Sequence, residues 1–356
     1  MLTNKQIYNE LSEYVSDELL AGNSAVENIE FGPLEVNYFS FCFWVNATFD
    51  SGQQGMYVKI PKIILYNKEN RQIMPLSSQD RKLAEDEYHS LVHLSKHWPN
   101  NEFEVHFIKP RAFIKKNNAI ITERVYGRDF FKIYKKFDII RKFNNKPNFT
   151  HNILSRLGAT LSMFHQKSIR ECRFNIESII IKIENCCSQL KYFGISKEYL
   201  DNIVQKFNKM KSYELLTHQS NTLKGFDVRQ VFINNEEKIF LLDPGKIKTN
   251  YVEMDLARFI VTCRILYWGS ILLFLRISPN PSYEESFLNS YYGNNKRPIK
   301  VLSILIIKEL LKHWRMAHIV TEMKSWPSPI KNFIKKNYID SFYKSQINTE
   351  LPKLEI

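Results

Sequence analysis

A lysine and a glutamate lie where two successive elements could bring them together. Lys59 is flanked by Val58 and Ile60 near the end of an apolar run, so in a strand its ammonium would point inward and need a partner. Glu87 lies on the following run with helical spacing and can supply that partner. Such a pair can order the phosphates of a nucleotide. The alternative is a lysine at a strand edge whose ammonium reaches water.

A glutamine begins one apolar run, and an aspartate directly follows the next one. Asp243 directly follows Ile239–Leu242 and precedes Pro244 and Gly245. A carboxylate in this position can bind a magnesium ion, although an aspartate that begins a Pro-Gly turn is also common. Gln230 lies thirteen residues earlier. Its amide oxygen could be a second ligand, on an arm one methylene longer than that of asparagine.

Two charged residues precede Gln230. As a hypothesis, the carboxylate of Asp227 accepts the proton of a substrate hydroxyl. The same carboxylate could instead cap its own loop by accepting hydrogen bonds from nearby backbone N–H groups. Arg229 could pair with a phosphate or with Asp243. The sequence leaves two roles open for each residue.

The elements that must position these residues follow from the spacing of the apolar side chains. Residues 1–25 have helical spacing, and residues 29–60 are rich in β-branched and aromatic residues broken by turn signals, which predicts an antiparallel meander. Residues 78–97 return to helical spacing after a Ser-Ser-Gln-Asp start signal. Further strands are predicted at Val105–Ile108, Ala112–Ile114 and Ala119–Glu123, and a hairpin at Gln230–Ile233 and Ile239–Leu242.

This order of elements predicts an α+β protein with two lobes. We expect a helical extension over residues 1–25 and a small lobe over residues 26–125, built from an antiparallel sheet and one long helix. The larger lobe, residues 126–356, is expected to be mostly helical, with the hairpin as its one pair of strands. Such an arrangement is typical of kinases.

Several segments, in the right order, resemble the aminoglycoside phosphotransferase and choline kinase-like family. The resemblance covers about residues 30–275 and implies a protein kinase-like fold. Its segments are the strand at Lys59, the helix at Glu87, the hinge Glu123-Arg124-Val125-Tyr126-Gly127, Leu157 to His165, Phe226 to Ile233, Leu241 to Gly245 and Val252 to Phe259.

The resemblance also implies cofactors and roles. ATP would be bound with Mg²⁺, and Lys59 and Glu87 would order its phosphates. Backbone groups near Glu123 and Val125 would meet the adenine edge. Asp243 and Gln230 would hold the metal, Asp227 would orient the substrate hydroxyl, and Asp255 would organise the loop from the start of its helix.

The catalytic loop departs from the family pattern of His-x-Asp-x-x-x-x-Asn. An alignment without gaps puts Gln230 at the Asn position, Leu223 at the His position and Gly225 at the Asp position. A rival alignment uses His218-Gln219-Ser220 and an insertion, and its third residue is no base at neutral pH. Neither supplies the aspartate, so Asp227 is proposed as a displaced base.

Two functions of different classes therefore stay open. The first is an ATP-dependent phosphotransferase acting on a hydroxyl of a small molecule, with a sugar or glycan-type acceptor expected. The second is a catalytically degenerate kinase fold that binds a nucleotide or a protein or glycan partner. Side chains that could bind the acceptor, or could equally be core residues, are Tyr267, Trp268, Tyr291, Tyr292, His313, Trp314, Arg315 and His318.

Composition limits the class of protein. The chain has 356 residues, 44% of them hydrophobic, and a formal net charge of +13, which predicts a folded protein with an anionic partner. A phosphorylated ligand fits that charge, and peripheral contact with an anionic membrane stays open. We do not expect nucleic acid, because the densest basic cluster, residues 132–146, is interleaved with aromatic residues as a surface helix would be.

The cysteines and the apolar runs indicate in which cellular compartment the protein is expected. Five cysteines lack metal-ligand spacing, and the first residues lack the apolar core of a signal peptide, so a reducing, cytoplasmic setting is expected. The most apolar stretch, residues 259–277, contains Arg264 and Arg276. A charge within a membrane span is costly, which favours a buried helix.

Overall fold

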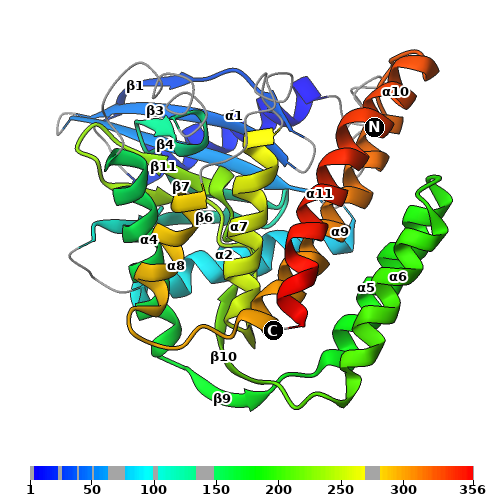
Figure 1. The fold of residues 1–356 in the computed structure, drawn as a ribbon. Helices are drawn as coiled ribbons and strands as arrows, with labels where there is room; N and C mark the ends of the chain where they lie inside the picture. Colours follow the sequence, from blue (N-terminus) through cyan, green and yellow to red (C-terminus); the bar gives the residue numbers. More distant parts are fainter. Residues whose placement is uncertain are drawn as a thin grey trace. The chain divides into compact units, whose positions relative to one another are not determined.

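The computed structural model describes residues 4–22, 26–37, 40–49, 52–62, 77–98, 103–133, 148–268 and 281–355 (Figure 1). Two units can be distinguished, and each is described by itself. Unit 1 contains Met1–Asn100, Glu104–Asp129 and Gln230–Ile247. Unit 2 contains Asn101–Phe103, Phe130–Arg229 and Lys248–Ile356.

An antiparallel sheet forms most of unit 1, as the alternating pattern predicts. Its strand order is β1-β3-β4-β7-β6, and β2 pairs with β3. The long β3–β4 hairpin aligns Cys42 with Lys59 and Phe43 with Val58. The strands are β1 (Val26–Phe31), β2 (Glu35–Val36), β3 (Ser40–Phe49), β4 (Gly52–Pro61), β6 (Pro110–Ile114) and β7 (Ala119–Glu123).

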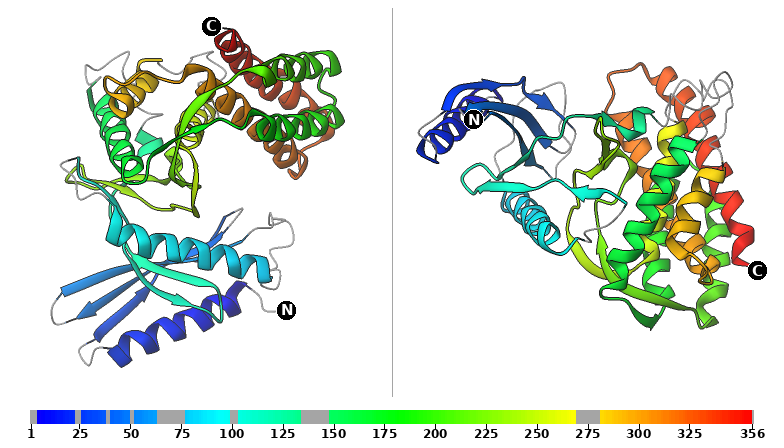
Figure 2. Two further views of the ribbon diagram at one scale, coloured as in Figure 1. Left: turned by 90° about the horizontal axis from the view of Figure 1, so that it is seen from below. Right: turned by 90° about the vertical axis from the view of Figure 1, so that its left-hand side faces the viewer.

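Two helices cover opposite faces of this sheet (Figure 2). Leu11 and Val15 of α1 (Asn4–Gly22) pack in one core with alternate residues of β3 and β4. Because successive strand side chains point to opposite faces, Lys59 lies on the face away from Val58 and Ile60. That face is the one covered by α2 (Ser78–His97), which starts with a capping box at Ser77.

A second sheet of unit 1 contains the predicted hairpin. Its order is β5-β12-β11-β8, and β11 pairs with β12 in antiparallel register, with Val231 opposite Leu241. β12 pairs with β5 in parallel register, a contact between segments far apart in sequence. The strands are β5 (Val105–Phe107), β8 (Arg128–Asp129), β11 (Val231–Ile233) and β12 (Ile239–Leu241).

Unit 2 is mostly helical, as predicted. The centre of its core is α9, whose Trp314 is fully buried and stacks on Tyr343 of α11. The helices are α4 (Asn148–Gln166), α5 (Ile176–Tyr192), α6 (Lys197–Lys209), α7 (Glu253–Trp268), α8 (Pro281–Tyr292), α9 (Ile299–Glu322), α10 (Ser328–Ile334) and α11 (Ser341–Glu350). Shorter turns are η1 (Met210–Ser212), η2 (Val228–Gln230), η4 (Lys335–Asp340) and η5 (Leu351–Leu354).

The expectation that the hairpin is the one pair of strands in residues 126–356 is wrong. Three further strands, β9 (Arg170–Arg173), β10 (Leu216–Leu223) and β13 (Ile247–Tyr251), form a sheet in the order β13-β10-β9. The buried side chains of β10 include Thr217, Ser220 and Thr222. A strand that buries hydroxyls in place of aliphatic side chains has no apolar alternation to reveal it.

The apolar stretch from residue 259 begins in α7, whose residues from Phe259 to Cys263 are buried, as expected of a core helix. Its part beyond Trp268, and the basic cluster beyond Ile133, lie outside the described residues. None of the helices that the structure describes combines the length and the hydropathy needed to cross a bilayer. All five cysteines are free thiols.

Candidate active site

Three predicted site residues meet in unit 1. The ammonium Nζ of Lys59 lies 2.7 Å from Oε1 of Glu87 and 2.7 Å from Oδ2 of Asp243. Glu87 comes from the buried stripe of α2, and Asp243 follows β12. The expectation that Glu87 pairs with Lys59 is confirmed, and the snorkelling alternative is wrong. The same ammonium also contacts Asp243, which the sequence did not indicate.

The electrostatics of this ion cluster are those of one cation between two anions. Burial disfavours the ammonium of Lys59, but the charges of Asp243 and Glu87 outweigh burial and raise its pKa. Burial and the nearby charge of Asp243 raise the pKa of Glu87 to about 7, although Lys59 opposes that shift. The cluster therefore has more negative charge than its lysine balances, and a further cation would stabilise it.

The segment after β12 is attached to α2 at several points. Nζ of Lys246 donates to both carboxylate oxygens of Asp86 at 2.8 Å, and the backbone N–H of Ile247 donates to Oγ of Ser90 at 3.2 Å. Together with the Lys59 contacts, these bonds fix residues 243–247 against one face of α2. Asp86 and Lys246 were not predicted, because the pairing joins segments 160 residues apart.

The donor atoms near Asp243 suit magnesium. Oδ1 of Asp243 accepts from the backbone N–H of Gly245 at 2.9 Å, in a turn where Gly245 has a φ of 57°. The N–H of Leu242 donates to the carbonyl of Gln230 at 2.9 Å, so Gln230 lies at the same end of the hairpin as Asp243. Hard oxygen ligands in small number, completed by phosphate oxygens and water, are what Mg²⁺ prefers.

Beyond this pair, no group of three or more His, Cys, Asp or Glu side chains in the described ranges could hold a metal ion. Asp243 and Gln230 therefore stay predicted metal ligands, one through a carboxylate and one through an amide oxygen.

The hinge residues are held by the strands on either side. The N–H of Glu123 donates to the carbonyl of Lys109, and Oε1 of Glu123 accepts from the N–H of Lys109, both at 2.9 Å. The following N–H, that of Arg124, donates to Gly55, and its guanidinium lies over the ring of Trp44. The hinge is therefore ordered before any ligand binds.

The turn after β1 offers no phosphate loop at its single glycine. The N–H of Gly32 donates to the carbonyl of Trp44 at 2.8 Å, and its carbonyl accepts from the hydroxyl of Tyr8 at 3.0 Å. A Cβ at Gly32 would lie 2.2 Å from the Trp44 ring. This glycine thus serves close packing, and its backbone groups already have partners. Residues 38 and 39 of the same turn lie outside the described part of the chain.

In unit 2 the loop after β10 begins with a tight turn. The carbonyl of Leu223 accepts from the N–H of Phe226 at 3.2 Å, which brings Gly225 to the corner of the turn. Farther along, Oδ1 of Asp227 accepts from both the N–H and Nε of Arg229 at 2.9 Å, and the guanidinium also pairs with Oδ2. Asp227 has the backbone bond expected of a loop cap, and Arg229 pairs with it in addition.

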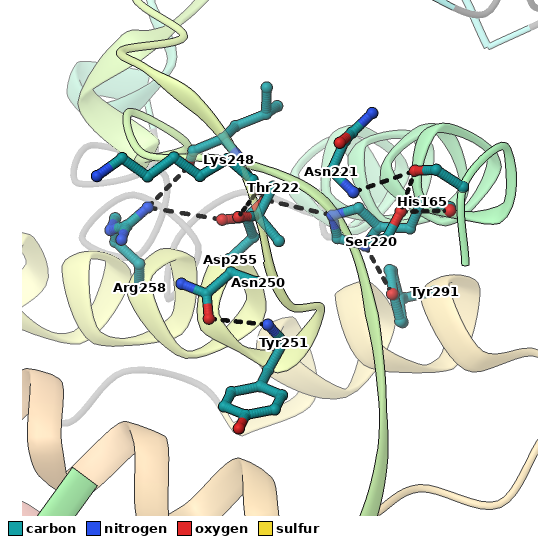
Figure 3. Close-up of polar contacts among 12 residues, drawn as sticks. His165, Ser220, Asn221, Thr222, Lys248, Asn250, Tyr251, Asp255, Arg258 and Tyr291 are labelled. Carbon is teal, nitrogen blue, oxygen red and sulfur yellow. Dashed lines mark hydrogen bonds and ion pairs between the residues drawn. The ribbon is translucent and has the colours of Figure 1, made fainter. Parts of the chain in front are cut away.

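Asp255 and Arg258 of α7 clamp the start of this loop (Figure 3). Oδ2 of Asp255 accepts from the N–H of Leu223 at 2.7 Å, and NH1 of Arg258 donates to the carbonyl of the same residue, also at 2.7 Å. Nε2 of His165 lies 3.3 Å from that carboxylate, and its Nδ1 lies 2.7 Å from the hydroxyl of Tyr291. The expectation that Asp255 organises the loop is confirmed.

Comparison with known proteins adds to this geometry. No protein-family model matches the sequence, and neither does any curated protein. Among solved structures, choline kinase LicA from Streptococcus pneumoniae aligns with a TM-score of 0.51 and 12% identity, over 96% of this chain and 99% of that chain. The ternary complex of streptomycin, ATP and APH(2")-IIa gives 0.51 and 10%, over 99% of both chains. ADP-bound APH(2'')-Ib gives 0.51 and 11%, over 96% and 98%.

The chain has the fold of these kinases. The predicted α+β, protein kinase-like fold is confirmed, and so is the resemblance at the level of fold.

The structure also distinguishes between the two alignments that the sequence allows for the catalytic loop. His218 and Gln219 pair with Glu171 and Arg170 in the β10–β9 ladder. Ser220 is fully buried, and its hydroxyl donates to the carbonyl of His165 at 2.6 Å. The rival triplet thus lies inside a strand, whereas the loop itself follows Leu223. This favours the ungapped alignment, in which Gly225 occupies the aspartate position.

Most of the aromatic residues suggested for an acceptor are core residues of the kinase fold. Tyr291, Tyr292, Trp314 and His318 are buried, and His318 pairs with Asp340 at 2.7 Å. These four cannot offer a stacking surface, so the core alternative holds for them. The side chains of Tyr267 and Trp268 lie outside the described residues.

Proposed function

We propose that the chain transfers a phosphoryl group from ATP, in the presence of Mg²⁺, to a hydroxyl of a small molecule, with a sugar or glycan-type acceptor. The observation that carries the proposal is the contact of Lys59 with both Glu87 and Asp243 at 2.7 Å. A partly buried lysine between two acidic side chains, in a fold shared with choline and aminoglycoside kinases, is suited to bind phosphates beside a metal ion.

Unit 1 would bind the nucleotide. Lys59, oriented by Glu87, would neutralise charge on its phosphates. Asp243 and Gln230 would hold Mg²⁺, which when bound neutralises charge developing on the transferred phosphoryl group. Backbone groups around Glu123 and Val125 would recognise the adenine edge.

Asp227 and Arg229 would act on the acceptor. The acceptor oxygen attacks the γ-phosphorus, the bond from that phosphorus to the bridging oxygen breaks, and ADP leaves. The hydroxyl proton passes to the carboxylate of Asp227, which requires the guanidinium of Arg229 to move aside or to remain on one oxygen only. Because phosphoryl transfer depends mainly on positioning and charge, a displaced base is compatible with turnover.

The charges near Asp227 favour a neutral or anionic acceptor. The carboxylates of Asp227 and Glu309 are buried, whereas Arg229 and Lys312 are about half exposed. Burial, followed by the charge of Lys312, lowers the pKa of nearby His313 to about 4, so its imidazole is neutral. A surface with buried anions and exposed cations repels a polycation and attracts a sugar with phosphate or carboxylate groups.

A second candidate is a kinase fold that binds a nucleotide without transferring phosphate. It is favoured by one specific observation, namely that the aspartate position holds Gly225 while the nearest carboxylate is paired with Arg229. The ion cluster at Lys59 would then serve binding alone.

A thermal-shift titration tests the proposal. At 100 times its dissociation constant, ATP with Mg²⁺ should stabilise the parent protein by about 2.7 kcal/mol. The shift should require Mg²⁺ and should be lost in Asp243→Ala, while the matched surface variant Asp201→Ala keeps it. No shift under any condition would rule out the nucleotide site. A shift without phosphate transfer to any sugar in a broad acceptor panel would favour the second candidate.

A further inference from the structure

The turn between α9 and α10, with α10 itself, exposes four large apolar side chains in unit 2. Met323 is 38% exposed, Trp326 43%, Ile330 49% and Phe333 56%. Met323 and Trp326 lie in the turn, and Ile330 and Phe333, three residues apart, lie on one face of α10. We call these four side chains the apolar ridge. Large apolar side chains gathered on one surface mark an interaction site far more often than single exposed residues do.

Lysines flank the apolar ridge. Residues 322–336 contain four lysines and one acidic residue, a net charge of +3. The ammonium of Lys324 lies 5.8 Å from the centroid of the Trp326 ring, and Lys336, three residues after Phe333, is exposed. The acidic residue, Glu322, is itself paired with Lys331 and Lys335. The surface around the ridge is therefore basic.

Contacts with α9 hold the segment that follows α10, while the apolar ridge stays exposed. Asp340, at the end of η4, accepts from Nε1 of Trp314 at 2.8 Å and pairs with His318 at 2.7 Å, both on α9. Ile339 is buried beside them. In Figure 1, α10 lies at one end of the hairpin formed by α9 and α11. Ile330 and Phe333 are thus presented by a helix whose C-terminal continuation is tied to α9.

We propose that the apolar ridge and its lysines bind the surface of an anionic membrane. Ile330 and Phe333 lie on one face of α10, and Met323 and Trp326 lie in the turn before it. When this segment lies at the bilayer surface, its apolar groups enter the headgroup region and the ammoniums beside them meet lipid phosphates. Charge complementarity selects this partner, because a basic rim around an apolar ridge attracts anionic lipids. The proposal does not depend on phosphoryl transfer.

Vesicle sedimentation tests the proposal with the full chain. The protein should sediment with vesicles of phosphatidylcholine and phosphatidylserine in equal amounts, and much less with phosphatidylcholine alone. Lys324→Gln with Lys336→Gln should weaken partitioning about fivefold per lysine, since each lysine near such a surface contributes about 1 kcal/mol. Lys182→Gln with Lys197→Gln, two exposed lysines elsewhere in unit 2, is the matched control and should change little.

Further substitutions test the apolar side chains of the ridge. Phe333→Ser should weaken binding at least tenfold, whereas Tyr192→Ser, which removes an aromatic ring that is 89% exposed elsewhere, should leave it unchanged. Trp326→Phe should retain binding but remove a lipid-dependent blue shift in tryptophan fluorescence. Absence of sedimentation with both vesicle types, or equal effects of ridge and control variants, would overturn the proposal, and a partner of another class would then have to be sought.

Discussion

In unit 1 two carboxylates contact Lys59 at 2.7 Å, whereas in unit 2 the loop after β10 has Gly225 at the position where the resembled family pattern has an aspartate. The first region contains the charged groups that the proposed phosphate binding would use. The second contains the elements that position a loop, Asp255 and Arg258, but its carboxylate at Asp227 is displaced and paired. The loop is therefore held in place by Asp255 and Arg258 even though the expected aspartate is absent from it.

Burial explains why the two regions respond differently to change. Removing the charge of Lys59 leaves the buried carboxylate of Glu87 without compensation, which costs several kcal/mol. The guanidinium of Arg229 is half exposed, so its loss is buffered by water. A substitution at Lys59 is therefore expected to cost more stability than one at Arg229.

The largest effect is expected for Lys59→Met. The buried carboxylate of Glu87 and the partly exposed carboxylate of Asp243 would lose their shared cation, so the free energy of unfolding should fall by about 3 kcal/mol and nucleotide binding should disappear. Arg229→Met should cost only about 1 kcal/mol. Chemical denaturation of both variants measures the difference. Equal losses would mean that the Lys59 cluster is far more hydrated than its geometry indicates.

Gly225→Asp should restore the missing base. A carboxylate at this position would add general-base catalysis, so Mg²⁺-dependent phosphate transfer or ATP hydrolysis should rise by about a hundredfold. Gly225 is not among the glycines of the described chain with positive φ, so its backbone accepts a side chain. Lys224→Asp, one residue away, is the control. A decrease in rate in Gly225→Asp would speak against the ungapped alignment.

Asp227→Asn distinguishes between two roles of Asp227, that of a catalytic base and that of a loop cap. If Asp227 accepts the proton, turnover should fall about a hundredfold while the melting temperature changes little, because asparagine can still accept the N–H of Arg229. Asp201→Asn, at a surface ion pair with Lys191, controls for charge. Unchanged turnover together with a lower melting temperature would assign Asp227 to loop structure alone.

The smallest effect concerns pH. Burial raises the pKa of Glu253 to about 7, although the hydrogen bond that Thr217 donates to Oε2 opposes this shift. Its other oxygen, Oε1, is buried without a hydrogen-bond partner in the described ranges. A carboxyl whose pKa is raised on folding costs stability as pH rises from about 4.5 to about 7.

The unfolding free energy should therefore fall across this window, and Glu253→Gln should make the fall shallower. Glu87 titrates in the same range, so the variant removes only one of the two contributions. ATP with Mg²⁺ should suppress the part due to Glu87 and leave that of Glu253. Denaturation curves at several pH values measure both, and a slope unchanged in Glu253→Gln would contradict the assignment.

Much of unit 1 could be predicted because its chemistry coincides with local pattern. Lys59 lies in a strand with clear alternation and Glu87 in a helix with a clear apolar stripe, so their pairing followed from two adjacent elements. The contacts of Lys246 with Asp86 could not be predicted, because they depend on the parallel pairing of β12 with β5. No periodicity in a single sequence reports such a long-range contact.

Unit 2 was harder to predict for a different reason. β10 buries hydroxyls that bond to neighbours such as His165 and Lys248, and side chains of this type are as common in loops as in strands. The role of Arg258 is likewise invisible in the sequence, where it is one of many surface-type residues. Its spacing of three residues from Asp255 is the one local signal, since both lie on one face of α7.

The attachment of residues 243–247 to α2 has a consequence for how tightly a ligand can bind. Asp86, Glu87 through Lys59, and Ser90 tie residues 243–247, the proposed magnesium-binding segment, to α2. The conformational entropy of assembling the proposed phosphate site would therefore be lost when the protein folds and not when a nucleotide binds. A ligand entering this site keeps its binding energy for its own contacts.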